Sequence, residues 1–205
     1  MRCVNCGASS LRTICAACAA NLAECRLGMR QVEGFSVFYY YGYSEIRELI
    51  LSKHHEYGAA VFARIASLSL AKFPLHLQRE ISANPQNYKA FKTDGIFKFN
   101  AVPLDDDARS GYSHTAILAR ALKSKLIEPK FHCLRAQNRV KYTGQSLEFR
   151  LKHKRNFKIL TPPQFPVILV DDIITSGLSM LQARETLMQG GFTPVCGLVL
   201  ANAKE

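Results

Sequence analysis

The sequence predicts an α/β fold with an open, mostly parallel β-sheet flanked by helices, preceded by a small cysteine-rich module. Four cysteines are paired near the N-terminus, apolar runs alternate with helical patterns along the rest of the chain, and residues 167–200 have the pattern strand, helix, strand. With 205 residues the chain is long enough to bury a core. We expect a zinc-binding four-cysteine module at 1–33 and an α/β domain at 34–205.

The N-terminal module contains two CxxC pairs, formed by Cys3, Cys6, Cys15 and Cys18. Each pair can turn both sulfurs toward one point, and two pairs supply the four ligands of a tetrahedral, structural Zn²⁺ site. Gly7 permits a tight turn after the first pair, and Cys25 is a poorly spaced alternative ligand. The other interpretation is four buried or redox-active cysteines. Because we expect a reducing compartment, the paired spacing favours zinc.

The first half of the domain predicts one strand followed by helices. Residues 19–32 have mixed polarity and are expected to be a link, whereas 35–43 is rich in aromatic and β-branched residues and predicts a strand. Ser44 is the expected cap of the next helix. A longer helix is expected at about 57–73, ending before the proline that follows. Residues 75–94 give no clear pattern.

The middle of the chain predicts further alternation of strands and helices. Residues 96–104 alternate in polarity and predict a strand, which leads into a polar loop at 105–113. A helix is expected at about 114–127, and 131–134 predicts a short strand. Five histidines show no metal-ligand spacing, and we expect them to be surface or core residues: His54, His55, His114, His132 and His153.

Residues 167–200 predict two buried parallel strands joined by a helix. The runs 167–170 and 195–200 are continuous and apolar, which is typical of strands covered on both faces. The segment 178–189 has a helical pattern and is followed by two glycines that would end the helix. Ligands of such sheets bind outside the carboxyl ends of the strands, so the residues after 170 are the expected site.

Two carboxylates and a hydroxyl-rich turn follow the first of these strands. The turn leads to a helix N-terminus, where free N–H groups and the helix dipole favour an anion. Two acids beside a phosphate make sense if they bind sugar hydroxyls or Mg²⁺. The pattern therefore predicts a ribose 5-phosphate ligand, bound by Asp171, Asp172, Ile173, Ile174, Thr175, Ser176, Gly177 and Ser179.

The stretch VILVDDIITSGLS at 167–179 resembles the thirteen-residue motif of the type I phosphoribosyltransferases. Four apolar positions, two acids, two apolar residues and a Thr-Ser-Gly turn all conform. The resemblance implies a type I phosphoribosyltransferase-like fold, in which the turn holds the 5-phosphate of phosphoribosyl pyrophosphate (PRPP) and the acids face the ribose. The alternative is an incidental strand–turn–helix junction with an acidic cap, which agreement over thirteen positions disfavours.

The whole chain resembles the ComF (ComFC) competence proteins, which join a four-cysteine zinc module to a phosphoribosyltransferase-like domain. The matching features are the paired cysteines, YYYGYSEIRELILSKHHEYG with Lys53, VPL at 102–104, RSGYSHTAILARAL with Arg109, RVKYTGQSLEFRLKHKRNF and the motif at 167–179. The resemblance implies a role in DNA uptake during natural transformation, with single-stranded DNA and a DNA-translocating ATPase as partners.

The chain departs from that family in the loop that meets the pyrophosphate in phosphoribosyltransferases. The family loop is usually basic, but this chain has Asp105, Asp106 and Asp107, and Ser113–His114 replaces the usual Asn-Gln. Three acids oppose a pyrophosphate unless Mg²⁺ lies between them. Whether the chain is an enzyme is therefore left open by the sequence.

Residues 134–158 carry eight basic side chains and one acid, which accounts for +7 of the net charge of +11. Aromatic residues are interleaved with the basic ones, a pattern that suits single-stranded nucleic acid. The alternatives are a solvated basic loop, or a loop that closes over pyrophosphate. The candidate ligands of pyrophosphate or DNA are Arg109, Lys53, Arg139, Lys141, Arg150, Lys152, Lys154 and Arg155.

Three functions follow from these features. The first is a ComF-like DNA-uptake protein that binds single-stranded DNA and a PRPP-like ligand. The second is an active phosphoribosyltransferase that uses PRPP and Mg²⁺ on an unknown acceptor, and the third is a regulator that senses PRPP without chemistry. The start of the chain lacks the apolar core of a signal peptide, and we expect a cytoplasmic protein without membrane insertion.

Overall fold

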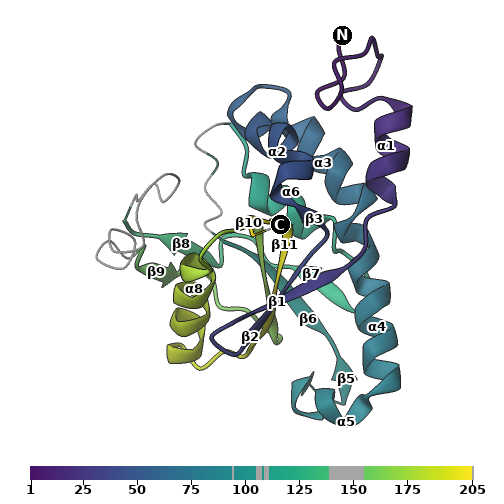
Figure 1. Ribbon diagram of the computed structural model, residues 1–205. Helices are drawn as coiled ribbons and strands as arrows, with labels where there is room; N and C mark the ends of the chain where they lie inside the picture. Colours follow the sequence, from purple (N-terminus) through teal and green to yellow (C-terminus); the bar gives the residue numbers. More distant parts are fainter. Residues whose placement is uncertain (94, 105–107, 109–110, 139–154, 205) are drawn as a thin grey trace.

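The computed structural model describes residues 1–93, 95–104, 108, 111–138 and 155–204 (Figure 1). Its centre is a seven-stranded sheet made of β1 (Gly28–Val32), β2 (Phe35–Tyr39), β3 (Tyr41–Gly42), β6 (Phe99–Pro103), β7 (Ile127–Pro129), β10 (Val167–Ile174) and β11 (Pro194–Asn202). The strand order is β1-β2-β11-β10-β6-β7, and β3 pairs with β11 beside this path. β1 and β2 are antiparallel, and the other pairs are parallel.

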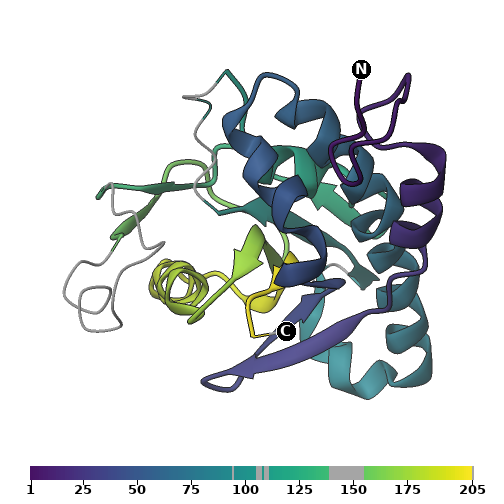
Figure 2. The same cartoon turned by 45° about the horizontal axis from the view of Figure 1, so that its top comes forward.

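Helices cover both faces of the sheet, which confirms the predicted α/β class (Figures 1 and 2). The α-helices are α1 (Ala16–Ala23), α2 (Tyr43–Leu51), α3 (Gly58–Leu68), α4 (Phe73–Ala83), α5 (Pro85–Tyr88), α6 (His114–Arg120) and α8 (Leu178–Gln189). Short 3₁₀ turns are η1 (Ser52–His54), η2 (Leu70–Lys72) and η3 (Lys89–Phe91). Two small antiparallel hairpins pair β4 (Lys92–Thr93) with β5 (Ile96–Phe97) and β8 (Leu134–Ala136) with β9 (Phe157–Ile159).

Alternate side chains of β10 enter two separate cores. Ile168 and Val170 pack in the core that contains residues of α2, α3 and α6, whereas Val167 and Leu169 pack with residues of α8. All four side chains have 0% exposure. Since β10 lies between β6 and β11 and is covered on both faces, its sequence is continuously apolar rather than alternating.

The strand expected at 35–43 is interrupted, and the helix after it begins earlier than predicted. β2 ends at Tyr39, and α2 starts at Tyr43 with Gly42 as its N-cap instead of Ser44. The side chain of Glu45 accepts the N–H of Gly42 at 2.7 Å. The carboxylate of Glu45 in the first turn therefore caps this helix, in place of the hydroxyl group of Ser44 that the sequence predicted.

The helix expected at 57–73 is divided into two helices. α3 ends at Leu68, and α4 begins at Phe73. Pro74 lies in the first turn of α4, where its lack of an N–H costs no hydrogen bond, because N–H groups of the first turn have no partner within the helix. In the described part of the chain, the stretch Gly58–Ala83 is long and apolar enough to cross a membrane, by length and composition only. Its side chains Phe62 and Leu77 instead belong to the larger core, which is consistent with a soluble protein.

Two edge strands were not predicted. The link expected at 19–32 contains the end of α1 and the whole of β1, and the helix expected at 114–127 ends at Arg120 before the short strand β7. The strand expected at 131–134 instead begins at Leu134. Short edge strands are stabilised by pairing with a neighbour, so their own sequences carry little strand pattern. The division at residue 33 stays a prediction, although β1 pairs with β2 in the sheet.

Candidate functional site

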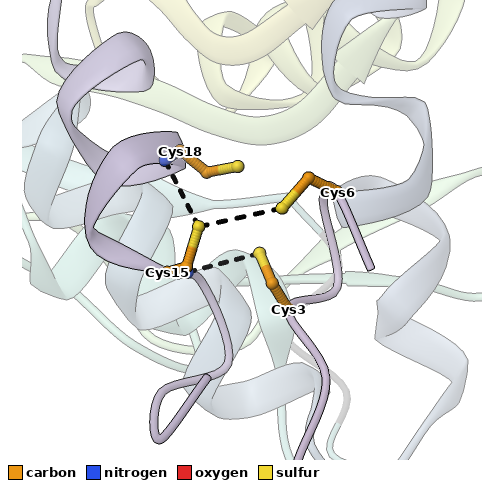
Figure 3. A group of neighbouring side chains, drawn as sticks. All are labelled: Cys3, Cys6, Cys15 and Cys18. Carbon is orange, nitrogen blue, oxygen red and sulfur yellow. Dashed lines mark hydrogen bonds between the residues drawn. The ribbon is translucent and has the colours of Figure 1, made fainter. Parts of the chain in front are cut away.

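The four paired cysteines lie together near the N-terminus, and their side chains point toward one another (Figure 3). Their sulfur atoms all lie within 4.8 Å of one another. The N–H of Cys15 donates to the sulfur of Cys3 at 3.3 Å, and the N–H of Cys18 donates to the sulfur of Cys15 at 3.5 Å. Such N–H donors support thiolate ligands, and the cluster could bind a metal such as zinc.

Local backbone geometry brings the two pairs together. The first pair turns at Gly7, which has a φ of 75° and donates its N–H to the carbonyl oxygen of Cys3 at 2.9 Å. The second pair lies at the start of α1, where Cys15 is the N-cap. Burial alone would raise the pKa of the Cys3 thiol, but hydrogen bonds from the backbone of Cys15, Cys6 and Asn5 lower it to about 6. A thiol with a low pKa is readily available as a metal ligand.

A cavity of about 420 Å³ lies at the carboxyl end of β10. Its lining combines the residues after Val170, Lys53 and His54 of η1, and His114 and Thr115 of α6. From β6 the chain continues through α6 to β7, whereas from β10 it continues through α8 to β11. The chain therefore leaves two neighbouring strands in opposite directions, and open α/β sheets bind ligands at such a point.

The two acids lie inside β10 rather than after it. The strand extends to Ile174, four residues further than predicted, and Asp171 and Asp172 are part of it. In the described residues, β6 accompanies β10 as far as Val170, whereas β11 accompanies it to Ile174. The acids therefore lie where β10 has passed the end of one neighbour, and both belong to the lining of the cavity.

Asp172 is a buried carboxylate that forms an ion pair. Its side chain accepts a hydrogen bond from Lys53 Nζ at 2.7 Å, and His114 Nε2 lies 3.7 Å from the same oxygen. Burial alone would raise the pKa of Asp172, but the charges of Lys53 and His114 lower it below its ordinary value. Asp172 is therefore a fixed negative charge at neutral pH.

Asp171 is half-buried, and its charge state differs from that of its neighbour. Its Oδ1 accepts the N–H of Asp172 at 2.9 Å. Burial and the negative charge of Asp172 raise the pKa of Asp171 to about 8, although the positive charge of Arg155 opposes this shift. At neutral pH a carboxyl group with this pKa is mostly protonated, so Asp171 can donate a hydrogen bond as well as accept one.

Lys53 is held in place by a segment far away in the sequence. Tyr112 donates its hydroxyl to the carbonyl oxygen of Lys53 at 3.1 Å. A Cβ atom on Gly58 would collide with that hydroxyl, so the glycine makes room for the tyrosine. Burial alone would lower the pKa of Lys53, but Asp172 raises it above its ordinary value, and the ammonium stays charged.

The hydroxyl-rich turn is closed by a glycine in the left-handed region. Gly177 has a φ of 86° and is the N-cap of α8. Thr175, Ser176 and Ser179 line the cavity beside it. The first N–H groups of a helix have no partner within the helix, so this turn can bind an anion.

The cavity gathers most of the described residues that the sequence predicted for the site. It is lined by Lys53, Arg155, Asp171, Asp172, Ile173, Ile174, Thr175, Ser176, Gly177 and Ser179. Other candidates lie outside the described residues, namely Arg109, Arg139, Lys141, Arg150, Lys152 and Lys154, as do the acids at 105–107.

His114 was predicted to be a surface or core residue, and the structure places its half-buried imidazole beside the two acids. Its imidazole groups with Asp171 and Asp172, and ligand atoms of the three lie within 4.8 Å of one another. The sequence offered one indication that His114 lies near the site, namely its position in the RSGYSHTAILARAL segment that resembles the ComF proteins. Arg30 of β1 was missed as well, because nothing near it in the sequence relates it to the turn that it contacts.

No protein-family model matches this chain, and neither does any curated protein. The resemblance to the ComF proteins therefore stays a prediction.

Proposed function

We propose that this chain is a ComF-like competence protein with a type I phosphoribosyltransferase-like domain, which binds a phosphoribosyl ligand such as PRPP at residues 171–179. One observation carries the proposal: a hydroxyl-rich turn at the N-terminus of α8 and the adjacent acids Asp171 and Asp172 line the same cavity at the carboxyl end of β10. A phosphorylated sugar matches this pairing, because its phosphate suits the helix N-terminus and its hydroxyls can hydrogen-bond to carboxyl groups.

Each part of the ligand has a matching group in the cavity. The N–H groups at the start of α8 and the hydroxyls of Thr175 and Ser176 would bind the 5-phosphate. Asp171, protonated at neutral pH, would exchange hydrogen bonds with a ribose hydroxyl. Lys53 and Arg155 would supply positive charge for a second anionic group such as pyrophosphate.

The acids also fit a divalent cation. Asp171, Asp172 and His114 each offer a ligand atom within 4.8 Å of the others, and carboxylate oxygens are suitable ligands for Mg²⁺. A cation bound here would displace the proton of Asp171, since a metal ligand must be deprotonated. Bound Mg²⁺ would neutralise part of the charge of a pyrophosphate.

We further propose that the basic segment 134–158 binds single-stranded DNA, in support of DNA uptake beside a translocating ATPase. Its described ends lie on the hairpin β8–β9, and Arg155, two residues before the start of β9, lines the cavity. The segment contributes +7 of the net charge, which suits a sugar–phosphate backbone. The rest of the segment lies outside the described residues.

An active phosphoribosyltransferase is the second candidate. The observation that favours it is the same combination of a phosphate turn with carboxylates that can hold Mg²⁺. The two candidates share the ligand and differ only in whether pyrophosphate is released.

Ligand binding can be tested by calorimetry with PRPP and with ribose 5-phosphate, each with and without Mg²⁺. We expect both to bind the wild type, and the double variant Asp171→Asn, Asp172→Asn to lose at least about tenfold in affinity, since bonds to charged groups contribute about 1.5–3 kcal/mol each. Glu185→Gln, an exposed acid on α8, is the matched control. Equal affinity of the double variant would exclude the proposed site, and pyrophosphate release with candidate acceptors would favour the enzyme.

DNA binding can be tested separately by filter binding of single-stranded DNA across a salt series. The affinity should fall steeply as salt rises, because phosphate contacts release counterions. An affinity that barely changes with salt would contradict binding through the basic segment.

A further inference from the structure

Arg30 connects the edge of the sheet to the turn at the cavity. β1 is separated from β10 by β2 and β11, and Figure 2 shows the β1–β2 hairpin at the edge of the sheet. The guanidinium of Arg30 nevertheless donates from Nη1 to the carbonyl oxygen of Thr175 at 2.7 Å. The same nitrogen lies 3.2 Å from Oδ1 of Asn202, at the end of β11. One side chain therefore contacts the ends of both central strands.

β1 contacts the turn at a second point. Val32 is two residues after Arg30, and alternate residues of a strand face the same side. A Cβ atom added to Gly177 would lie 2.6 Å from Cγ1 of Val32, so valine and glycine are in close contact. The turn is thus held by a hydrogen bond at Thr175 and by packing at Gly177.

The other partner of Arg30 is itself well anchored. Asn202 is 3% exposed, and its Oδ1 also accepts the N–H of Lys204 at 3.2 Å. The N–H of Ala203 donates to the carbonyl oxygen of Ile174 at 2.9 Å, which ties the end of β11 to the residue before the turn. Arg30 therefore contacts a buried, hydrogen-bonded residue at the end of a central strand rather than a second loop.

The hydrogen bond to Thr175 sets the orientation of the next peptide group. In a trans peptide the carbonyl oxygen and the following N–H point in opposite directions. When the oxygen of Thr175 points to Arg30, the N–H of Ser176 must point away from β1. Both residues line the cavity, so this peptide is one that a bound phosphate would meet.

We propose that Arg30 is a positioning residue for the anion site, which it serves by orienting the Thr175–Ser176 peptide without contacting the ligand. The inference rests on the proposed function only for the identity of the ligand. The proposal gives β1, which lies within the predicted N-terminal module 1–33, a role in ligand binding by the α/β domain.

The first measurement needs no ligand. Hydrogen exchange of the amides at 175–178 is compared in the wild type and in Arg30→Met, a neutral side chain of similar length. We expect exchange at the turn to be about tenfold faster in the variant, since a bond from a charged donor is lost. Exchange in the buried part of β10, 167–170, should not change. Unchanged exchange at the turn would overturn the proposal.

The second measurement is the affinity for ribose 5-phosphate by calorimetry. Arg30→Met should weaken binding about tenfold or more, whereas Arg30→Lys, which keeps a charged donor, should restore most of it. Arg26→Met removes an exposed arginine just before β1 and should have no effect. Weaker binding with unchanged exchange would mean that Arg30 acts through charge alone, and the positioning role would be refuted.

The two proposals fail in different ways. If the wild type binds no ribose 5-phosphate, the proposed function fails, while the exchange experiment still decides whether Arg30 holds the turn. If Arg30→Met does not fold, as judged by circular dichroism, Arg30→Gln replaces it in both measurements, with the same expected and contrary results.

Discussion

Replacement of Gly177 by alanine measures how tightly the turn is packed against β1. The glycine has a φ of 86°, and an added Cβ would lie 2.6 Å from Cγ1 of Val32. The left-handed conformation costs a residue with a Cβ about 1–2 kcal/mol. An extra methyl group in a packed site costs about 1–3 kcal/mol. We expect the free energy of unfolding to fall by about 2–5 kcal/mol, a large part of the stability of a typical domain.

Gly191 provides the matched control for this experiment. It has a φ of 81°, and no atom lies within 4 Å of a Cβ built on it. Gly191→Ala should therefore show the backbone cost alone, about 1–2 kcal/mol. Urea unfolding of both variants, followed by circular dichroism, gives the two free energies, and their difference measures the contact with Val32.

A double-mutant cycle with Val32→Ala completes the test. Removal of the valine methyl groups should relieve the collision but leave the backbone cost, so Gly177→Ala should be less destabilising in that background. Equal shifts of the urea midpoint in Gly177→Ala and Gly191→Ala would contradict a collision with Val32, as would an unchanged effect of Gly177→Ala in the Val32→Ala background.

Three further predictions concern charges and cysteines. Lys53→Met leaves the buried Asp172 without its ammonium partner and should lower the free energy of unfolding in urea by about 3–5 kcal/mol at neutral pH. Because the pKa of Asp172 is lowered in the folded state, the stability from this pair should vanish as the pH falls through that pKa, and the wild type and variant should converge in acid. The raised pKa of Asp171, about 8, acts with the opposite sign: the wild type should lose stability as the pH rises from about 4 to 8, and Asp171→Asn should flatten this part of the pH profile in thermal unfolding. Cys15→Ser should lower the zinc content of the purified protein, measured by a colorimetric chelator, while Cys196→Ser, at a buried cysteine outside the cluster, should retain it.

Features encoded by nearby residues could be predicted from the sequence. The CxxC spacing brings pairs of sulfurs together through a single turn, so the cluster of Cys3, Cys6, Cys15 and Cys18 needed no knowledge of the fold. The β10–α8–β11 unit was predicted because its apolar runs and helical pattern lie within one short stretch. The bounds of α8 agree with the expected 178–189 for the same reason.

The charge states of the cavity depend on contacts between distant segments. Lys53 pairs with Asp172 across 119 positions, and Arg30 contacts Thr175 across 145. The adjacent acids Asp171 and Asp172 have the same chemistry in the sequence. Their pKa values shift in opposite directions in the folded chain. Asp172 is paired with the ammonium of Lys53, which lowers its pKa, whereas burial and the neighbouring negative charge raise the pKa of Asp171.

The sequence alone thus determined where the cysteine cluster, the central strands and the hydroxyl-rich turn before α8 lie along the chain, because spacing and periodicity are local properties. The tertiary structure decided which side chains complete the cavity, in which direction the pKa of each acid shifts, and that an edge strand contacts the turn. Those properties arise from burial and from short distances between charges, and both exist only after remote parts of the chain have packed together.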